Sequence, residues 1–167
     1  MEILAISGSL RAQSINLTLL EAAKRLAPSD FEITIFANLG AIPLFNPDLD
    51  TATPPLVVDL FREAIASADG ILISSPEYAR GVPGALKNAL DWLVSDHRVA
   101  GKAVALVNAA SGGGQDATTQ LALILTTMAT KVVFAESLVG ADVRQHAPHV
   151  EATVRRALEA LAATKGP

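Results

Sequence analysis

Short apolar runs alternate along this chain with longer segments of helical periodicity. The run Gly70–Ser74 is apolar almost throughout, as in strands that are buried on both faces of a parallel sheet. Leu17, Leu20 and Ala23 recur instead at the spacing of one helix face. The pattern predicts strands at 2–7, 31–36, 70–74, 102–107 and 131–136 and helices at 14–26, 56–67, 84–95, 118–128 and 150–163.

Strands that alternate with helices predict the α/β class, here a three-layer, doubly wound, parallel five-stranded sheet. Five strands fit the flavodoxin-like order 2-1-3-4-5, in which ligands bind outside the carboxyl ends of the strands. The length of 167 residues suits a single domain over 1–167. Loops 8–16, 75–83 and 108–116 all follow strands that would be adjacent at this edge, so we expect them to form one site.

Two apolar features fall outside the predicted core. Segment 38–55 is long for a loop but contains Ile42, Leu44 and Phe45, so we expect it to cover a site or to reach a neighbouring subunit. Trp92 lies off the apolar face of its predicted helix and is expected to pack between subunits or against the next loop. Together they predict a homo-oligomer.

Composition narrows the possible functions. The net charge is −4 and Lys and Arg form no run, which argues against a nucleic-acid partner. No apolar stretch is long enough for a membrane span, and the start Met1-Glu2 has no basic leader, so we expect no targeting peptide. With 0 cysteines and scattered histidines, we expect no disulfide and no metal site. A cytoplasmic protein is the default expectation.

The loop after the first strand carries an anion-binding pattern. Gly8 allows a sharp turn, Ser9, Ser14 and Asn16 offer side-chain donors, and Arg11 offers a bidentate fork. A helix that begins here would add unpaired N–H groups and a positive dipole end. The alternative is that Ser14 is only a helix N-cap and Arg11 only a solvated surface residue.

Two common phosphate loops are excluded. The next glycine after Gly8 is Gly40, so G-x-G-x-x-G is absent, and no G-K-[ST] pair occurs. The end of the second strand, Ile35–Asn38, lacks the acid with which dinucleotide folds hold a ribose. The loop therefore fits a terminal phosphate without a bound adenosine ribose.

Taken together, these motifs resemble those of the NAD(P)H-dependent FMN reductase family, which includes quinone, azo-dye and chromate reductases. The resemblance rests on Gly8–Arg11 with Ser14 and Asn16, on Pro76-Glu77-Tyr78 and on Pro83–Trp92. It implies a phosphate held by loop 8–16, an isoalloxazine ring along loop 75–83 and a flavin flanked by loop 108–116. The FMN-binding residues so implied are Ser9, Arg11, Ser14, Ile15, Asn16, Pro76, Glu77, Tyr78, Ala79, Gly81 and Ser111.

The chain departs from the family pattern at two of these positions. Many members carry Asn after Pro-Glu-Tyr and Ser two residues later, where this chain has Ala79 and Gly81. We expect backbone N–H groups to reach the ring instead, with Gly81 easing the approach. Tyr78 could equally serve only to pack the loop.

The resemblance implies an enzyme in which NADPH or NADH reduces bound FMN. The flavin then reduces a quinone, free flavin, azo compound or similar small-molecule acceptor, and no protein side chain needs to act as a catalytic group. Family members are commonly homodimers or homotetramers. The rival is a flavodoxin-type FMN-binding electron carrier without a nicotinamide site, which would usually be more acidic. A third alternative is an interaction module without a cofactor.

Overall fold

The centre of the computed structural model is a parallel sheet of five strands. The model describes residues 1–165, so the last two residues of the expected domain lie outside it. The order is β2-β1-β3-β4-β5 and all neighbours are parallel, which confirms the predicted topology. The strands are β1 (Glu2–Ser7), β2 (Glu32–Ile35), β3 (Gly70–Ser74), β4 (Ala103–Ala110) and β5 (Lys131–Val139).

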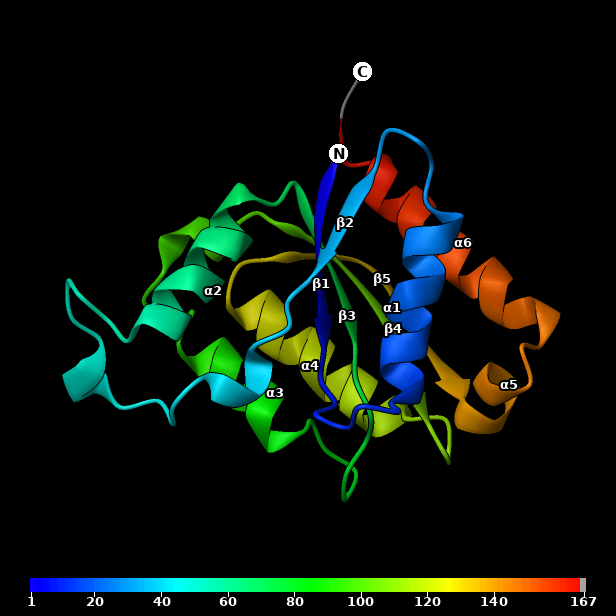
Figure 1. Ribbon diagram of the computed structural model, residues 1–167, viewed down its shortest axis with the longest axis horizontal. Coiled ribbons are helices and arrows are strands. Elements are labelled where there is room, and N and C mark those ends of the chain that lie inside the picture. The colour runs from blue at the N-terminus through cyan, green and yellow to red at the C-terminus, as the bar shows by residue number, and fades with distance from the viewer. Residues whose placement is uncertain (166–167) are drawn as a thin grey trace.

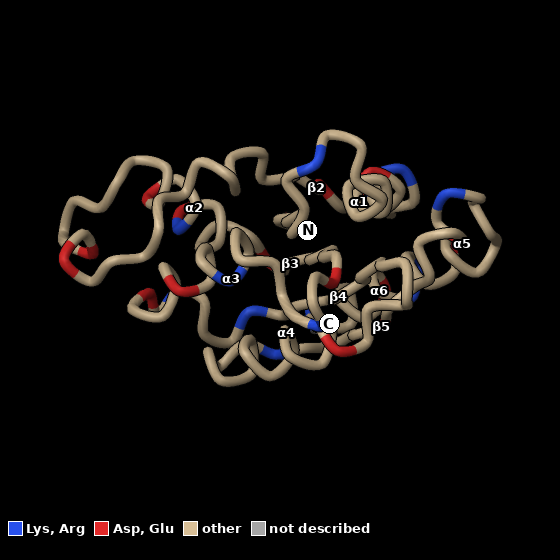
Figure 2. The backbone as a smooth tube through the Cα atoms, turned by 90° about the horizontal axis from the view of Figure 1, so that it is seen from below, with Lys and Arg blue, Asp and Glu red and all other residues tan. Residues whose placement is uncertain are grey.

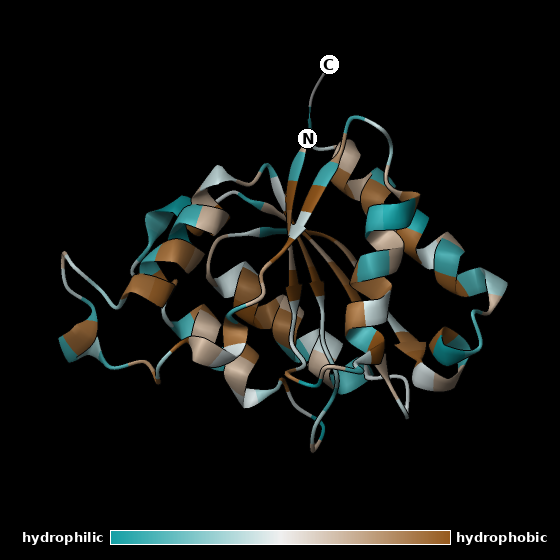
Figure 3. Ribbon diagram, in the orientation of Figure 1, coloured by the Kyte–Doolittle hydropathy of each residue, from teal (hydrophilic) through white to brown (hydrophobic). Residues whose placement is uncertain are grey.

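Helices cover both faces of this sheet (Figure 1). On one face lie α1 (Ile15–Leu26) and α6 (Pro148–Ala162), and on the other lie α2 (Leu56–Ser67), α3 (Gly84–Asp91) and α4 (Gln115–Thr127). The strands are mostly apolar between the two helical layers (Figure 3). Among residues 1–165, no helix has the length and apolar character needed to cross a membrane.

The two-residue period of the strands builds two cores. In β1, Ile3 and Ala5 are buried with α1 and α6, whereas Leu4 and Ile6 are buried with α2, α3 and α4. Each of these side chains is at most 4% exposed. A strand buried on both faces has no polar alternation, and for this reason the short apolar runs were recognisable in the sequence.

Several element boundaries differ from the prediction. β4 and β5 stay paired as far as Ala110 and Val139, beyond the predicted ends at 107 and 136, with Asn108 opposite Ser137. The predicted helix 84–95 ends earlier, at Asp91. A short helix, α5 (Gly140–Arg144), was not predicted.

The long segment 38–55 is folded onto α3. It forms short 3-10 turns at Leu39–Ala41 and Pro47–Leu49. The indole N–H of Trp92 donates to the Pro43 carbonyl at 2.8 Å, and its ring meets Phe45 edge-on at 5.2 Å. Trp92 is 0% exposed, so its expected place outside the core was wrong. It gives no support for a subunit contact.

An ion pair fastens the same segment to α2. Asp50 lies 2.9 Å from the Arg62 guanidinium, and both side chains are largely buried. The Ser95 hydroxyl also donates to Asp50. This hydrogen bond, together with Arg62, holds the pKa of the Asp50 carboxyl below its ordinary value despite partial desolvation.

Candidate functional site

The three loops meet at the carboxyl edge of the sheet, the lower edge in Figure 1. They surround a cavity of about 420 Å³, hereafter the first cavity. Seen toward this edge, acidic and basic residues are interspersed around the chain (Figure 2). Of the eleven residues predicted from the sequence, nine line the first cavity: Ser9, Arg11, Ser14, Ile15, Asn16, Pro76, Glu77, Tyr78 and Ser111.

Loop 8–16 is held against the end of β3. The Gly8 N–H donates to the Ser74 carbonyl at 2.8 Å. A Cβ on residue 8 would lie 2.5 Å from Ser75 Oγ, so only glycine permits this close approach. The loop then turns into α1, whose N-terminus faces the first cavity through Ile15 and Asn16. This places unpaired helix N–H groups and a positive dipole end beside the cavity.

Ser14 caps that helix. Its hydroxyl accepts hydrogen bonds from the N–H groups of Asn16 at 3.2 Å and Leu17 at 3.4 Å. The capping role proposed as the alternative is therefore real. A hydroxyl has one donor in addition to its acceptor lone pairs, so the cap leaves Ser14 able to donate to an anion in the first cavity.

Asn16, in the first turn of α1, joins the ends of two strands, β3 and β4. Its side-chain amide donates to the Ala109 carbonyl at 2.9 Å, and its oxygen accepts from the Ala109 N–H and the Ser74 hydroxyl, each at 2.9 Å. The β3–β4 ladder ends at Ile73 and Leu106, so on the β3 side Asn16 takes the place of a strand partner for Ala109. Its carbonyl oxygen and one of its two amide N–H groups are thus used within the protein. Asn16 also lines the first cavity, and its role as a phosphate donor stays a prediction.

Asn108 ties together the other two loops. Its oxygen accepts from the Ser75 N–H at 2.8 Å, and its amide donates to Thr118 Oγ1 at 2.8 Å. Thr118 in turn donates to the Gly114 carbonyl at 2.8 Å. All of these contacts are buried, so they fix loops 75–83 and 108–116 relative to each other. The signal in the sequence was a polar residue at the end of an apolar strand.

Residues 78–81 form a tight hairpin. Tyr78 and Gly81 exchange two backbone hydrogen bonds of 3.1 and 2.9 Å, and the two central residues, Ala79 and Arg80, have φ of 50° and 63°. Neither Ala79 nor Gly81 lines the first cavity. The Gly81 N–H is bonded to Tyr78 within the hairpin, and the expected approach of other backbone N–H groups of this loop to the ring stays a prediction.

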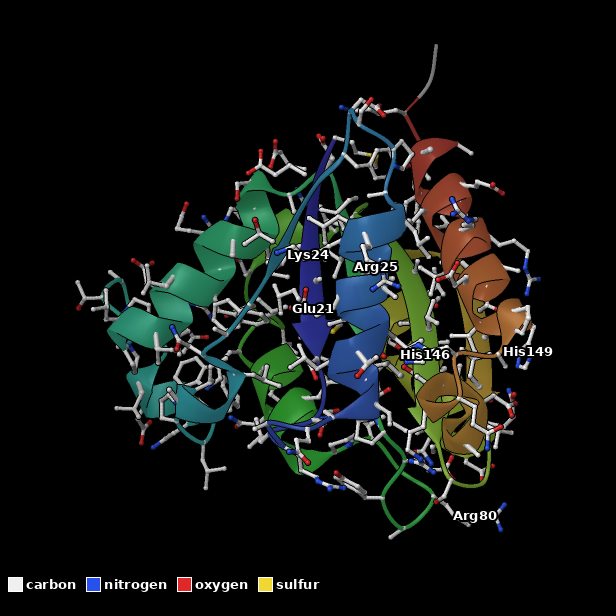
Figure 4. All side chains as sticks on the ribbon, turned by 45° about the vertical axis from the view of Figure 1, so that its right-hand side comes forward. Glu21, Lys24, Arg25, Arg80, His146 and His149 are labelled. Carbon is white, nitrogen blue, oxygen red and sulfur yellow. The ribbon has the colours of Figure 1, made fainter. Side chains whose placement is uncertain are left out.

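Three contacts fasten this hairpin to α4. The Glu77 carboxylate accepts from the Ala117 N–H at 2.9 Å in the first turn, and the Gln120 amide donates to the Arg80 carbonyl at 2.9 Å. Arg80 reaches Asp116 at 2.6 Å from an exposed position (Figure 4). The hydrogen bond and charge of Asp116 raise the pKa of Arg80. The hairpin is therefore positioned by α4 as well as by β3.

The first cavity has further lining residues: Gln13, Ala109 and Ala110 belong to the loops that the sequence indicated, whereas Arg144 lies outside them. Arg144 ends α5, which packs tightly on α1: a Cβ on Gly140 would lie 2.7 Å from Ile15 Cδ1. Arg11 and Arg144 thus bring two guanidinium groups to the helix N-terminus. This combination suits a strongly anionic group.

A family model described as NADPH-dependent FMN reductase matches residues 1–144. A 2-hydroxy-1,4-benzoquinone reductase of Burkholderia sp is 48% identical over 92 residues, 55% of this chain and 49% of that protein. A quinone reductase of Escherichia coli is 35% identical over 115 residues, 67% of this chain and 61% of that protein. The matched segments thus span about half to three fifths of these relatives.

Solved structures agree with the fold. The flavoenzyme FerB, an NAD(P)H:(acceptor) oxidoreductase from Paracoccus denitrificans, superposes with a TM-score of 0.80 at 26% identity, covering 96% of this chain and 97% of its own. The apo form of the NADH:FMN oxidoreductase EMOB gives a TM-score of 0.76 at 23% identity, covering 99% and 91%. Because the family model matches residues 1–144, the chain belongs to the NADPH-dependent FMN reductase family.

Proposed function

We propose that this protein is an NAD(P)H-dependent oxidoreductase that uses bound FMN. The observation that carries the proposal is the first cavity, where two arginines and a helix N-terminus meet at the carboxyl edge of a flavodoxin-like sheet. The family model supports both FMN and a nicotinamide donor, and the name of FerB, an NAD(P)H:(acceptor) oxidoreductase, supports the same donor.

The residues around the first cavity fit FMN. Ser9, Arg11, Ser14 and Arg144 supply hydroxyl and guanidinium donors suited to a terminal phosphate. Pro76, Ala109 and Ala110 supply apolar wall for a flat ring system. The volume of about 420 Å³ lies in the usual range for small-molecule sites, roughly 300–1,000 Å³.

The roles of the protein's own groups follow from this arrangement. When bound, FMN supplies the redox chemistry by accepting a hydride from the nicotinamide and passing reducing equivalents to the acceptor. Loop 8–16 binds the phosphate. The Glu77 contact with α4 and the Asn108 network hold loops 75–83 and 108–116 rigid, so that the ring and the donor are oriented rather than free to shift.

The acceptor we propose is a quinone or a similar small molecule, such as free flavin or an azo compound. The names of the curated relatives support a quinone. The zero cysteine count fits the reducing cytoplasm, which we propose as the compartment.

The test is the visible spectrum of the FMN-loaded protein before and after NADPH. We expect yellow protein that NADPH bleaches and a quinone restores. FMN should bind more tightly than riboflavin, and Arg11→Ala should weaken FMN binding by about 10- to 100-fold, because a hydrogen bond to a charged group is worth roughly 1.5–3 kcal/mol. Arg25→Ala, on the outer part of α1, is the control. If riboflavin bound as tightly as FMN, loop 8–16 would not be the phosphate-binding site. Bound FMN that NADPH does not bleach would indicate an electron carrier.

We further propose a homodimer or homotetramer. Leu44 is 83% exposed and Leu49 45% exposed on the long segment, and Leu56 and Leu60 on the adjoining helix α2 are 73% and 50% exposed. Exposed apolar side chains on this segment and on the helix that follows it favour a contact between copies. Light scattering should give a dimer or larger at micromolar concentration, and Leu56→Glu with Leu60→Glu should shift the mass toward the monomer. A monomeric wild type would contradict the proposal.

A further inference from the structure

A second cavity of about 560 Å³ lies on the other side of loop 8–16. It is bounded by this loop, by α1 and by the segment that follows β2. Ser9 and Arg11 line both this cavity and the first cavity. The two spaces therefore meet at the loop that we assign to the flavin phosphate.

The lining of the second cavity combines an apolar wall with polar groups. Leu17, Ile35, Phe36 and Leu39 supply the wall. The Phe36 ring is itself anchored on Phe61, with their centroids 4.9 Å apart. An apolar wall with a fixed aromatic ring suits a flat heterocycle.

The fold also supplies an acid that the local sequence lacks. The end of β2 carries no carboxylate, but Glu21 of α1 lines the second cavity together with Asn38. Figure 4 shows Glu21 on the body of α1, and Glu21 also borders β2 in the adjacent groove. Dinucleotide-binding folds hold ribose hydroxyls with a carboxylate at the end of the second strand, and here Glu21 of α1 brings a carboxylate to the cavity that the end of β2 lines.

From this geometry we propose that the second cavity is a subsite for the adenylate half of a flavin dinucleotide, so that the protein accepts FAD as well as FMN. The inference rests on the proposed flavin site. In FAD the adenylate phosphate is joined directly to the phosphate that FMN already carries, so the adenylate must leave the first cavity beside that phosphate. Arg11, shared by both cavities, is placed to contact both phosphates. Glu21 would accept from the ribose hydroxyls, and the adenine would lie on the apolar wall.

The experiment is calorimetric titration of the apoprotein with FMN and with FAD. We expect FAD to bind within about tenfold of FMN, a difference of no more than 1.4 kcal/mol. Ala37→Trp, at an exposed position of the second cavity, should fill this cavity. It should weaken FAD binding by about tenfold or more and leave the affinity for FMN unchanged. Ala52→Trp, exposed in the long segment, is the matched control and should leave both affinities unchanged.

A second variant guards against loss of folding. Glu21→Gln, on the exposed surface of α1, should weaken FAD by about three- to tenfold and leave FMN unchanged, because one hydrogen bond to a charged acceptor is weakened. FMN binding by each variant reports that it is folded.

Three results would overturn the inference. If FAD bound more than about 100-fold more weakly than FMN, the second cavity would not accommodate the adenylate. Equal losses of FMN and FAD in Ala37→Trp would mean that the two cavities are not independent. A raised KM for NADPH with unchanged FAD affinity would assign the second cavity to the nicotinamide nucleotide. Failure to bind either flavin would instead refute the proposed function itself.

Discussion

Replacing Asn16 with leucine separates a structural role from a ligand-binding one. Asn16 is 1% exposed, and its side chain satisfies both the N–H and the carbonyl of Ala109 as well as the Ser74 hydroxyl. Leucine has nearly the same size but neither donates nor accepts. Asn16→Leu therefore leaves two backbone groups without partners in a buried place where water cannot replace them.

The magnitude follows from these two groups. An unsatisfied buried polar group costs about 1–3 kcal/mol, so the pair predicts a loss of about 2–6 kcal/mol in the free energy of unfolding. The whole free energy of unfolding of a typical domain is only about 5–15 kcal/mol. Ser14→Ala removes only the helix cap on the same turn and should cost about 1 kcal/mol. The sum counts only the two backbone groups of Ala109 and leaves out the Ser74 hydroxyl.

Urea unfolding of the apoprotein, followed by circular dichroism, measures both variants at once. We expect a much lower midpoint for Asn16→Leu than for Ser14→Ala. The reasoning fails if the two variants are equally stable and Asn16→Leu selectively loses FMN affinity. That result would mean that Asn16 acts mainly as a phosphate ligand.

Two further predictions concern the hairpin and the long segment. In Gly81→Val the new Cβ would meet Gln120 at an ordinary 3.5 Å, so the hairpin should fold and retain FMN. Its added bulk should nevertheless slow flavin reduction by NADPH in stopped flow, since displacing the reacting groups by about 1 Å can lower a rate on the order of 100-fold. An unchanged rate would mean that the hairpin does not contact the donor. Asp50→Asn should cost about 1–3 kcal/mol near neutral pH. The folded pKa of Asp50 is depressed, so the difference in the free energy of unfolding between wild type and Asp50→Asn should be full above the ordinary pKa of 3.8. It should vanish as pH falls through the folded pKa. A difference that persists in acid would contradict the ion pair.

The order of the elements was readable from the sequence because their burial is periodic. Runs such as Gly70–Ser74 have both faces covered, and the α1 face repeats at helical spacing, so local pattern and tertiary burial carry the same information. The strand order followed from the alternation of strands and helices, and with it the meeting of the three loops at one edge. The Gly8 turn and the Ser14 cap are local in the same sense.

Contacts between distant segments could not be read in this way. The bond between Asn16 and Ala109 was not predicted, because nothing near Asn16 in the sequence indicates a partner 93 residues away. Trp92 lies off the apolar face of its predicted helix, and it is buried because segment 38–55 packs against it. Arg144 reached the first cavity through a short helix with no periodic signal, and Glu21 reached the second cavity from a helix rather than a strand end. The sequence by itself thus determined the sheet and the edge where ligands bind, because burial leaves a local pattern, whereas only the tertiary structure decided which polar groups remain free at that edge, because their partners are set by packing across the chain.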